Sequence, residues 1–233
     1  MLLVICSIIW YNFFGDFMRV ISGKYRGKIL DGFDIDGTRP TMDRVKESLF
    51  AMIQEKLINS VVLDLFAGSG GIGIEALSRG AKHAYFAENS KEALACIDYN
   101  IKHTKFTEES TILKQDAITA LSFTIKEKVD IVFCDAPYDK GYDRMVLEAG
   151  MNASCVTEDT LFIIEELKDT DFSYALSLGY DIIKENGHVT AKSLSGTLSG
   201  TVRTIERDIK YLRENGFIVK EGKHNDGVWK VLK

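Results

Sequence analysis

The feature that most constrains the fold is an apolar run that passes directly into a glycine-rich turn and a helix-forming stretch. Residues 61–66 are apolar except for Asp64, which predicts a buried strand, and glycines at positions 68, 70 and 73 follow before a helix expected over 74–79. Glycines permit positive φ and close backbone approach, and a helix N-terminus attracts electron-rich groups. This order predicts a parallel α/β sheet with a cofactor site, although the glycine spacing alone also fits a nicotinamide dinucleotide.

Acidic residues at strand ends narrow the choice of cofactor. The charge of Asp64 would repel a pyrophosphate, whereas it would stabilise the ammonium and sulfonium of S-adenosylmethionine. Glu88 ends the next expected strand, 84–87, where an acid can bind a ribose diol. Asp116 follows the strand expected over 111–115 and can accept from an adenine amino group. The alternatives are that Asp64 and Asp116 bond helix or loop amides and that Glu88 is only solvated.

A second cluster of chemically capable residues follows the apolar run 129–134. Asp135, Ala136, Pro137 and Tyr138 place a carboxylate, a turn and an aromatic ring at one strand end. An exocyclic amine is a poor nucleophile because its lone pair is delocalised. The Asp135 carboxylate and the Ala136 carbonyl could accept its two N–H bonds, while Tyr138 stacks on the base. This chemistry fits an adenine N6, a guanine N2 or a glutamine amide, and the alternative is a plain turn with Tyr138 in the core.

Three motifs in order resemble the bacterial small-subunit ribosomal RNA guanine-N2 methyltransferase family, RsmD. They are residues 38–50 (TRPTMDRVKESLF), 63–70 (LDLFAGSG) and 75–81 (EALSRGA), after a similar opening at 18–28, and the resemblance covers about residues 18–166. It implies a class I, Rossmann-like S-adenosylmethionine-dependent fold and guanine as the acceptor. The chain has Ala136 where that family usually has proline. The predicted cofactor site comprises Asp64, Phe66, Gly68, Ser69, Gly70, Glu88, Asn89, Asp116 and Ala117.

Composition adds limits on size, metals and partners. A chain of 233 residues with 45% hydrophobic content suits one α/β domain and a smaller unit. Its four cysteines have no metal spacing, so no metal site is predicted, and they fit a reducing cytoplasm. The net charge of −5 restricts nucleic-acid contact to local basic segments. One such segment is expected to hold RNA phosphates, unless it is simply solvated; it contains Lys24, Arg26, Lys28, Arg39, Arg44 and Lys46.

The two ends of the chain lie outside the resemblance. Residues 1–11 are apolar but too short to span a bilayer, and we interpret 1–17 as an extension upstream of the native start, with peripheral membrane attachment as the alternative. The methyltransferase domain is expected over 18–168. The family normally closes its sheet with a hairpin after the strand at 160–165. Without that hairpin, this strand is expected to be an exposed edge.

Residues 172–233 resemble a winged helix-turn-helix, a small α+β domain. Helices are expected over 174–185, 190–198 and 201–215, and strands over 217–220 and 228–232 bracket a hairpin signal at 225–227. Arg203, Arg207 and Lys210 lie off the apolar stripe of the third helix and could contact DNA. The alternative is a protein-interaction or dimerisation domain.

These observations predict a cytoplasmic, monomeric enzyme without membrane contact that methylates guanine N2 in small-subunit ribosomal RNA, with the RNA or a subunit assembly intermediate as its partner. An alternative enzyme is an adenine N6 DNA methyltransferase. A different class is a DNA-binding regulator whose degenerate methyltransferase domain senses a ligand.

Overall fold

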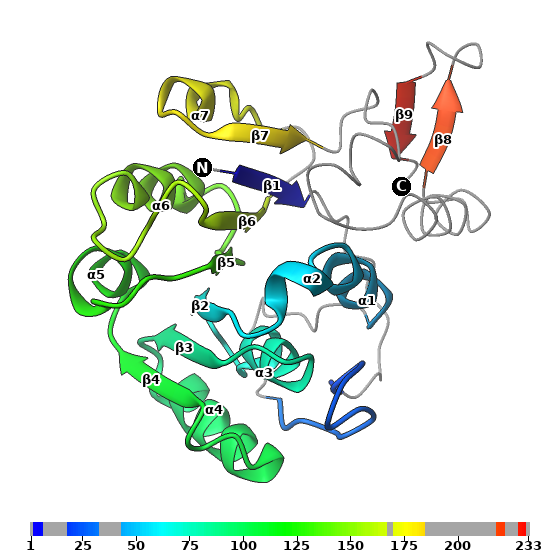
Figure 1. The fold of residues 1–233 in the computed structure, drawn as a ribbon, viewed down its shortest axis with the longest axis vertical. Helices are drawn as coiled ribbons and strands as arrows, with labels where there is room; N and C mark the ends of the chain where they lie inside the picture. Colours follow the sequence, from blue (N-terminus) through cyan, green and yellow to red (C-terminus); the bar gives the residue numbers. More distant parts are fainter. Residues whose placement is uncertain are drawn as a thin grey trace.

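A computed structural model describes residues 2–6, 18–32, 43–166, 170–184, 218–221 and 228–231. Its centre is a seven-stranded sheet in the order β4-β3-β2-β5-β6-β1-β7, in which every neighbouring pair is parallel (Figure 1). The strands of this sheet are β1 (Leu2–Cys6), β2 (Val61–Leu65), β3 (His83–Glu88), β4 (Ser110–Lys114), β5 (Ile131–Cys134), β6 (Leu161–Glu165) and β7 (Asp181–Lys184). The five strands expected from the sequence are confirmed.

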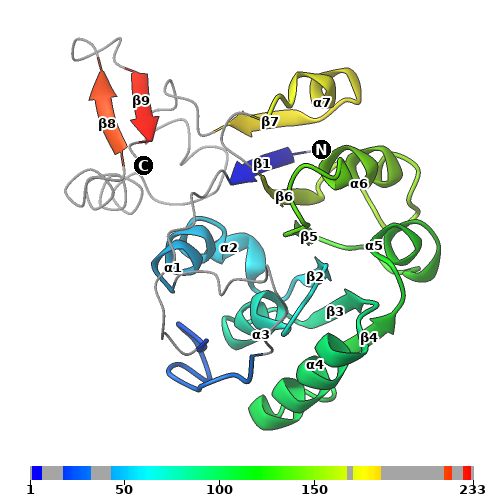
Figure 2. The ribbon, with the colours of Figure 1, turned by 180° about the vertical axis from the view of Figure 1, so that it is seen from behind.

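Helices cover both faces of the sheet, as Figures 1 and 2 show from opposite sides. One apolar cluster joins the sheet to the first four helices, and a second joins its other face to the remaining ones. The first group is α1 (Asp43–Met52), α2 (Gln54–Leu57), α3 (Gly71–Ser78) and α4 (Lys91–Thr104); the second is α5 (Ala117–Thr119), the π-helical turn η1 (Ala120–Thr124), α6 (Tyr142–Gly150) and α7 (Ser173–Ser177).

The central strands alternate between these two clusters with a period of two. Leu63 on β2 is paired with Val132 on β5, and both belong to the cluster under α5 and α6. The next pair, Asp64 and Phe133, faces the cluster under α3, so a carboxylate stands where the pattern otherwise places an apolar side chain. A buried acid at such a position indicates a function other than packing.

Residues 18–30 form a small antiparallel turn that packs on α3. Arg19 and Ile29 form its β-bridge, and the Glu75 carboxylate accepts the amides of Ile21 at 2.7 Å and Ser22 at 3.0 Å. Glu75 is fully buried and also accepts from Arg79 Nε at 2.5 Å. The opening segment of the resemblance is therefore fixed to the helix that follows the glycine loop.

The far edge of the sheet differs from expectation. The strand β1 lies between β6 and β7, with Leu2 opposite both Leu161 and Asp181. The prediction that residues 160–165 form an exposed edge is therefore wrong, because β6 is paired on both sides. The single helix expected over 174–185 is also wrong: this segment contains the end of α7 and the strand β7. Residues 181–184, which were expected in the C-terminal unit, therefore belong to the central sheet.

A separate two-stranded antiparallel sheet lies near the end of the chain. It consists of β8 (Ile218–Glu221) and β9 (Val228–Val231), which confirms the predicted strand pairing. The helices expected over 190–198 and 201–215, and the turn at 225–227, lie outside the described residues. None of the described helices is both long and apolar enough to cross a membrane.

Candidate active site

The predicted site residues follow the carboxyl ends of four adjacent strands. The chain leaves β2 toward β3 and β4 on one side and reaches β5 and β6 on the other, so the strand order reverses between β2 and β5. Ligands of open α/β sheets bind at such a switch point. Asp64 lies on β2 and Asp135 directly follows β5, so the structure brings the two predicted halves of the site together.

Asp64 is buried beneath the start of α3. Its exposed fraction is 2%, and its Oδ2 accepts the amide of Gly73 at 2.9 Å, as the helix-bonding alternative predicts. Burial is the largest influence on this carboxyl and raises its pKa to about 7, with further contributions from Asp135 and Glu88, while the Gly73 amide and Lys46 oppose the shift. Asp64 therefore needs a positive partner to be fully ionised at neutral pH.

The glycine loop has the tight geometry that its sequence predicts. Gly68 and Gly70 have φ values of 57° and 80°, in the left-handed region. At Gly73, an added Cβ would lie 2.3 Å from Phe86 Cε1, so a side chain there would collide with β3. The loop can thus pass close to the sheet only with glycine at this position.

Glu88 holds the loop from the neighbouring strand. Its Oε2 accepts the amide of Gly68 at 3.0 Å, and its Oε1 accepts those of Asn89 at 2.8 Å and Ser90 at 2.9 Å. The half-buried Phe66 next to the loop has a φ of 60° and packs on Tyr142 of α6 with 4.8 Å between ring centroids. Glu88 is therefore more than a solvated acid, because it joins β3 to the glycine turn.

Asp116 caps the short helix α5. Its Oδ1 accepts the amide of Thr119 at 2.9 Å, and the hydroxyl of Thr119, together with this amide, lowers the pKa of Asp116 below its usual value. The capping alternative is thus confirmed. The side chain is exposed at the carboxyl end of β4, and Ala117 behind it is buried.

The predicted catalytic turn leaves β5 at the switch point. Asp135 is exposed, Ala136 is buried and Tyr138 is half-buried. Although the Asp135 side chain reaches solvent, the protein around its carboxyl desolvates the charged form and raises its pKa to about 6. Tyr138 donates its hydroxyl to Glu165 Oε1 at 2.6 Å. The turn therefore presents an acid to solvent and holds its aromatic ring by the next strand.

Lys46 does not belong to the predicted RNA-binding segment. Its exposed fraction is 2%, and its Nζ donates to the carbonyl oxygen of Gly71 at 3.2 Å, in the first turn of α3. The interpretation of Lys46 as a phosphate contact is wrong, because the ammonium is buried behind the glycine loop. Its charge instead acts on Asp64, where it lowers the pKa of the carboxyl.

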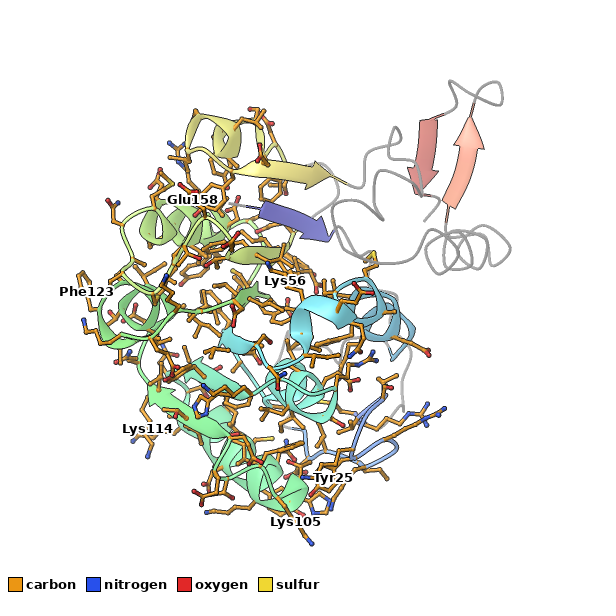
Figure 3. The ribbon with its side chains drawn as sticks, viewed as in Figure 1. Tyr25, Lys56, Lys105, Lys114, Phe123 and Glu158 are labelled. Atoms are coloured by element: carbon orange, nitrogen blue, oxygen red, sulfur yellow. The ribbon has the colours of Figure 1, made fainter. Side chains whose placement is uncertain are left out.

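Two lysines of the predicted basic segment surround an aromatic pair. Lys24 Nζ lies 5.4 Å and Lys28 Nζ 5.6 Å from the centroid of the Tyr25 ring, which meets Phe106 edge to face at 5.0 Å. Figure 3 shows Tyr25 beside Lys105, the residue that follows α4. Arg26 is exposed on the same turn. The side chains of the other predicted nucleic-acid contacts lie outside the described part of the chain: Arg39, Arg44, Arg203, Arg207 and Lys210.

Two residues near the site were not singled out in the sequence. Glu165 ends β6 as Glu88 ends β3, so the search for acids after apolar strands could have found it. Met18 Sδ lies 2.9 Å from the hydroxyl of Ser69 in the glycine loop, a contact that no sequence pattern indicates. Among the described residues, no group of three or more His, Cys, Asp or Glu is arranged to hold a metal ion.

The parallel sheet, the glycine loop at the switch point and the acids at the strand ends define a class I, S-adenosylmethionine-dependent methyltransferase fold. Solved structures similar to this chain include the Haemophilus influenzae protein HI0767, with a TM-score of 0.57 and 28% identity over 67% of this chain and 85% of that one. The Escherichia coli methyltransferase yhhF gives a TM-score of 0.55 and 28% identity, covering 63% and 79% of the two chains.

The chain belongs to the family described as Conserved hypothetical protein 95, whose model matches residues 18–190. YlbH of Bacillus subtilis is 36% identical over 156 residues, 66% of this chain and 85% of the relative. Ribosomal RNA small subunit methyltransferase D of Escherichia coli is 33% identical over 150 residues, 64% and 74% of the two chains. The resemblance stated from the motifs is confirmed, and the family match continues past residue 166 through α7 and β7.

Proposed function

We propose that this enzyme transfers a methyl group from S-adenosylmethionine to the N2 amino group of a guanine in small-subunit ribosomal RNA. The observation that carries the proposal is the placement of two acids at the switch point. Asp64 is buried on β2 beside the glycine loop, and Asp135 is exposed directly after the adjacent strand β5, on the turn that carries Tyr138. The first acid suits a cationic cofactor. The second suits an amine acceptor.

The acids of the site fit S-adenosylmethionine better than a dinucleotide. Asp64, Glu88 and Asp135 raise the negative potential at the strand ends, and the first of them is largely protonated below its raised pKa of about 7. A bound ammonium or sulfonium would favour the ionised form of Asp64, whereas a pyrophosphate would not. Asp64, Gly68, Gly70 and the loop residues Phe66 and Ser69 would hold the methionine end. Glu88, Asn89, Asp116 and Ala117 would hold the ribose and adenine.

S-adenosylmethionine supplies an electrophilic methyl carbon bound to a positive sulfur. On the acceptor side, the Asp135 carboxylate and the Ala136 carbonyl accept the two N–H bonds of the guanine amine, which returns its lone pair to nitrogen. The lone pair forms the new N–C bond as the C–S bond breaks with its electrons going to sulfur. Positive charge then develops on the amine beside Asp135, which can take the released proton and pass it to water.

The substrate assignment rests on relatives and on the charge of the basic turn. Proteins of Escherichia coli and Haemophilus influenzae that are 33% and 32% identical to this chain are named ribosomal RNA small subunit methyltransferase D. Lys24, Arg26 and Lys28 lie on the turn packed against α3, where they could hold RNA phosphates. A paired guanine hides its amino group, so the target base must be unpaired or flipped out.

The residues after β7 are proposed as a second, winged-helix unit that contacts DNA or RNA. The antiparallel pairing of β8 with β9 supports the wing of such a domain. This proposal is independent of methyl transfer, and a truncation after residue 184 would separate the two if it folds.

The experiment that tests the function uses the full chain, labelled S-adenosylmethionine and three substrates in parallel: unmodified small ribosomal subunits, naked ribosomal RNA and duplex DNA. Label in N2-methylguanosine, identified by nucleoside mass spectrometry, is the expected result. Label in N6-methyladenine of DNA would show instead that the chain is an adenine N6 DNA methyltransferase. Cofactor binding without transfer to any substrate would indicate a ligand sensor.

A further inference from the structure

The strand β6 contributes a buried carboxylate to the proposed catalytic turn. Glu165, the last residue of β6, has an exposed fraction of 9%, and its Oε1 accepts the Tyr138 hydroxyl at 2.6 Å. The two residues are 27 positions apart in the sequence. The contact therefore depends on the pairing of β5 with β6 and ties the turn after β5 to a neighbouring strand.

The backbone of Glu165 is fixed more firmly than that of the turn. Ile164, the preceding residue, is paired with Cys134 on β5, and Glu165 itself is opposite Cys6 on β1. The turn by contrast consists of exposed Asp135, Pro137 and Asp139 around buried Ala136, and Asp139 has a φ of 57°. A hydroxyl bonded to a fixed carboxylate limits the rotation of the Tyr138 side chain, because a charge-assisted bond is short and directional.

We propose that Glu165 is a positioning residue that orients the Tyr138 ring for stacking on the target base. The inference rests on the proposed function, in which Tyr138 fixes the plane of the base while Asp135 and the Ala136 carbonyl accept from its amine. Misplacement of the acceptor by about 1 Å can slow a transfer reaction by about 100-fold. In this role, Glu165 acts on turnover through the Tyr138 ring.

The alternative role for Glu165 is direct acceptance of a base N–H. The two roles differ in what the carboxylate must do. Positioning requires only an oxygen that accepts from the Tyr138 hydroxyl, which glutamine also provides. Direct contact with the base would use the charge itself, so glutamine would not replace glutamate.

The test compares Glu165→Gln, Glu165→Ala, Tyr138→Phe and the double variant Tyr138→Phe/Glu165→Ala. Tyr174→Phe is the matched control, because the Tyr174 hydroxyl bonds the buried Asp143 carboxylate at 2.7 Å on α6 and α7, outside the proposed site. We expect kcat to fall about 10- to 100-fold in Tyr138→Phe and Glu165→Ala, with no further loss in the double variant, since both remove one interaction. Glu165→Gln and Tyr174→Phe should stay within about threefold of the unaltered chain.

Cofactor binding and ring position provide readouts that do not require turnover. The affinity for S-adenosylhomocysteine, measured by calorimetry, should change less than about twofold in all variants. With 3-fluorotyrosine incorporated, the fluorine signal that disappears in Tyr138→Phe reports the ring. That signal should shift or broaden in Glu165→Ala and stay in place in Glu165→Gln and Tyr174→Phe.

Three outcomes would overturn the inference: additive losses in the double variant, a Glu165→Gln variant as slow as Glu165→Ala, or an unchanged Tyr138 fluorine signal in Glu165→Ala. If Glu165→Ala does not fold, Glu165→Gln still tests the inference. Its Tyr138 fluorine signal should stay in place, and its rate should remain well above that of Tyr138→Phe. If the unaltered chain methylates no substrate, the proposed function fails, and the fluorine signal alone decides whether Glu165 positions Tyr138.

Discussion

The two halves of the site hold their acids in different ways. At the carboxyl ends of β2, β3 and β4, the acids each accept backbone amides: Asp64 from Gly73, Glu88 from Gly68 and Asp116 from Thr119. On β5 and β6, the contact that secures the turn joins two side chains, Tyr138 and Glu165. The acids of the proposed cofactor half are therefore held by backbone amides, whereas the turn of the proposed catalytic half is held by a bond between two side chains.

Because of this difference, substitutions in the two halves should affect different properties of the enzyme. An acid that accepts backbone amides contributes to the local fold as well as to binding, so its replacement should change stability and cofactor affinity together. A side chain exposed on a turn, as Asp135 is, can be replaced with little change in packing. Changes in the catalytic half should therefore appear in kcat.

The largest effect is expected for Asp135→Ala. Loss of the acceptor at the site of developing charge should lower kcat by about 100- to 1,000-fold, as for removal of a preorganised electrostatic contact. Cofactor affinity by calorimetry should remain nearly unchanged. Asp139→Asn is the matched control, since it removes the same charge from the same turn and asparagine tolerates the φ of 57°. Equal activity of Asp135→Ala and the unaltered chain would remove Asp135 from the mechanism.

The next effect tests whether the catalytic half depends on the far edge of the sheet. Val4→Pro would interrupt β1, which is paired with Ile163 on β6 and Ile183 on β7. Proline removes a ladder hydrogen bond inside a sheet and leaves its acceptor unpaired, so we expect a loss of about 1 to 3 kcal/mol in the free energy of unfolding. Chemical denaturation measures the loss, and hydrogen exchange should show earlier opening of β6 and β7 than of β2 and β3. An unchanged unfolding free energy would mean that β1 does not support the sheet.

The far edge of the sheet, with β1 and β7, is also the part of the sheet that the sequence did not predict. The strands β2 to β6 were predictable because apolar runs alternate with helical stretches and end at acids or glycines. The run at Leu2–Cys6 is equally apolar, but its strand partners lie more than 150 residues away, and nothing local indicates that pairing. The segment 174–185 was interpreted as one helix, whereas Gly179, with a φ of 84°, follows α7 and allows the turn into β7.

Asp64→Asn should change two properties of the cofactor half in opposite directions. The raised pKa means that the folded chain holds a proton on Asp64 between pH 3.8 and about 7, whereas the unfolded chain does not. The ionised side chain therefore lowers stability as pH rises through this window, by up to about 4 kcal/mol at pH 8. Asparagine can still accept the Gly73 amide without the charge. We expect a melting temperature several degrees higher than that of the unaltered chain at pH 8 and little difference at pH 4.

Cofactor affinity should show the opposite sign. Asp64→Asn should weaken S-adenosylmethionine binding at least about 10-fold at pH 8, because a charged hydrogen-bond partner is lost. In the unaltered chain the affinity should fall as pH drops below about 7, where Asp64 gains its proton, and this dependence should be absent in the variant. A variant that is both less stable and pH-dependent in binding would show that another group titrates.

The positions of the acids in the site could be predicted from the sequence, whereas their contacts could not. Strand-end acids can be found by position, so Asp64, Glu88, Asp116 and Asp135 were identified, and the structure places all four at one edge of the sheet. What each carboxylate contacts depends on distant backbone geometry, which the sequence does not contain. Lys46 illustrates the limit, because a lysine in a charged segment is usually exposed, yet this one reaches Gly71 inside the domain.

The smallest effect asks whether the cofactor half also holds the RNA. Lys24→Gln/Lys28→Gln removes two charges from the turn packed on α3 without shortening that turn. If both lysines contact phosphates, RNA affinity should fall a few-fold and the slope of log affinity against log salt should decrease by about 1 to 2. Lys126→Gln/Lys128→Gln is the matched control, since these exposed lysines precede β5 and lie outside the basic turn. Equal salt slopes for both pairs would place the RNA elsewhere. A larger loss of RNA affinity for Lys24→Gln/Lys28→Gln would show that the turn binds the substrate. The proposed cofactor half would then bind both reactants.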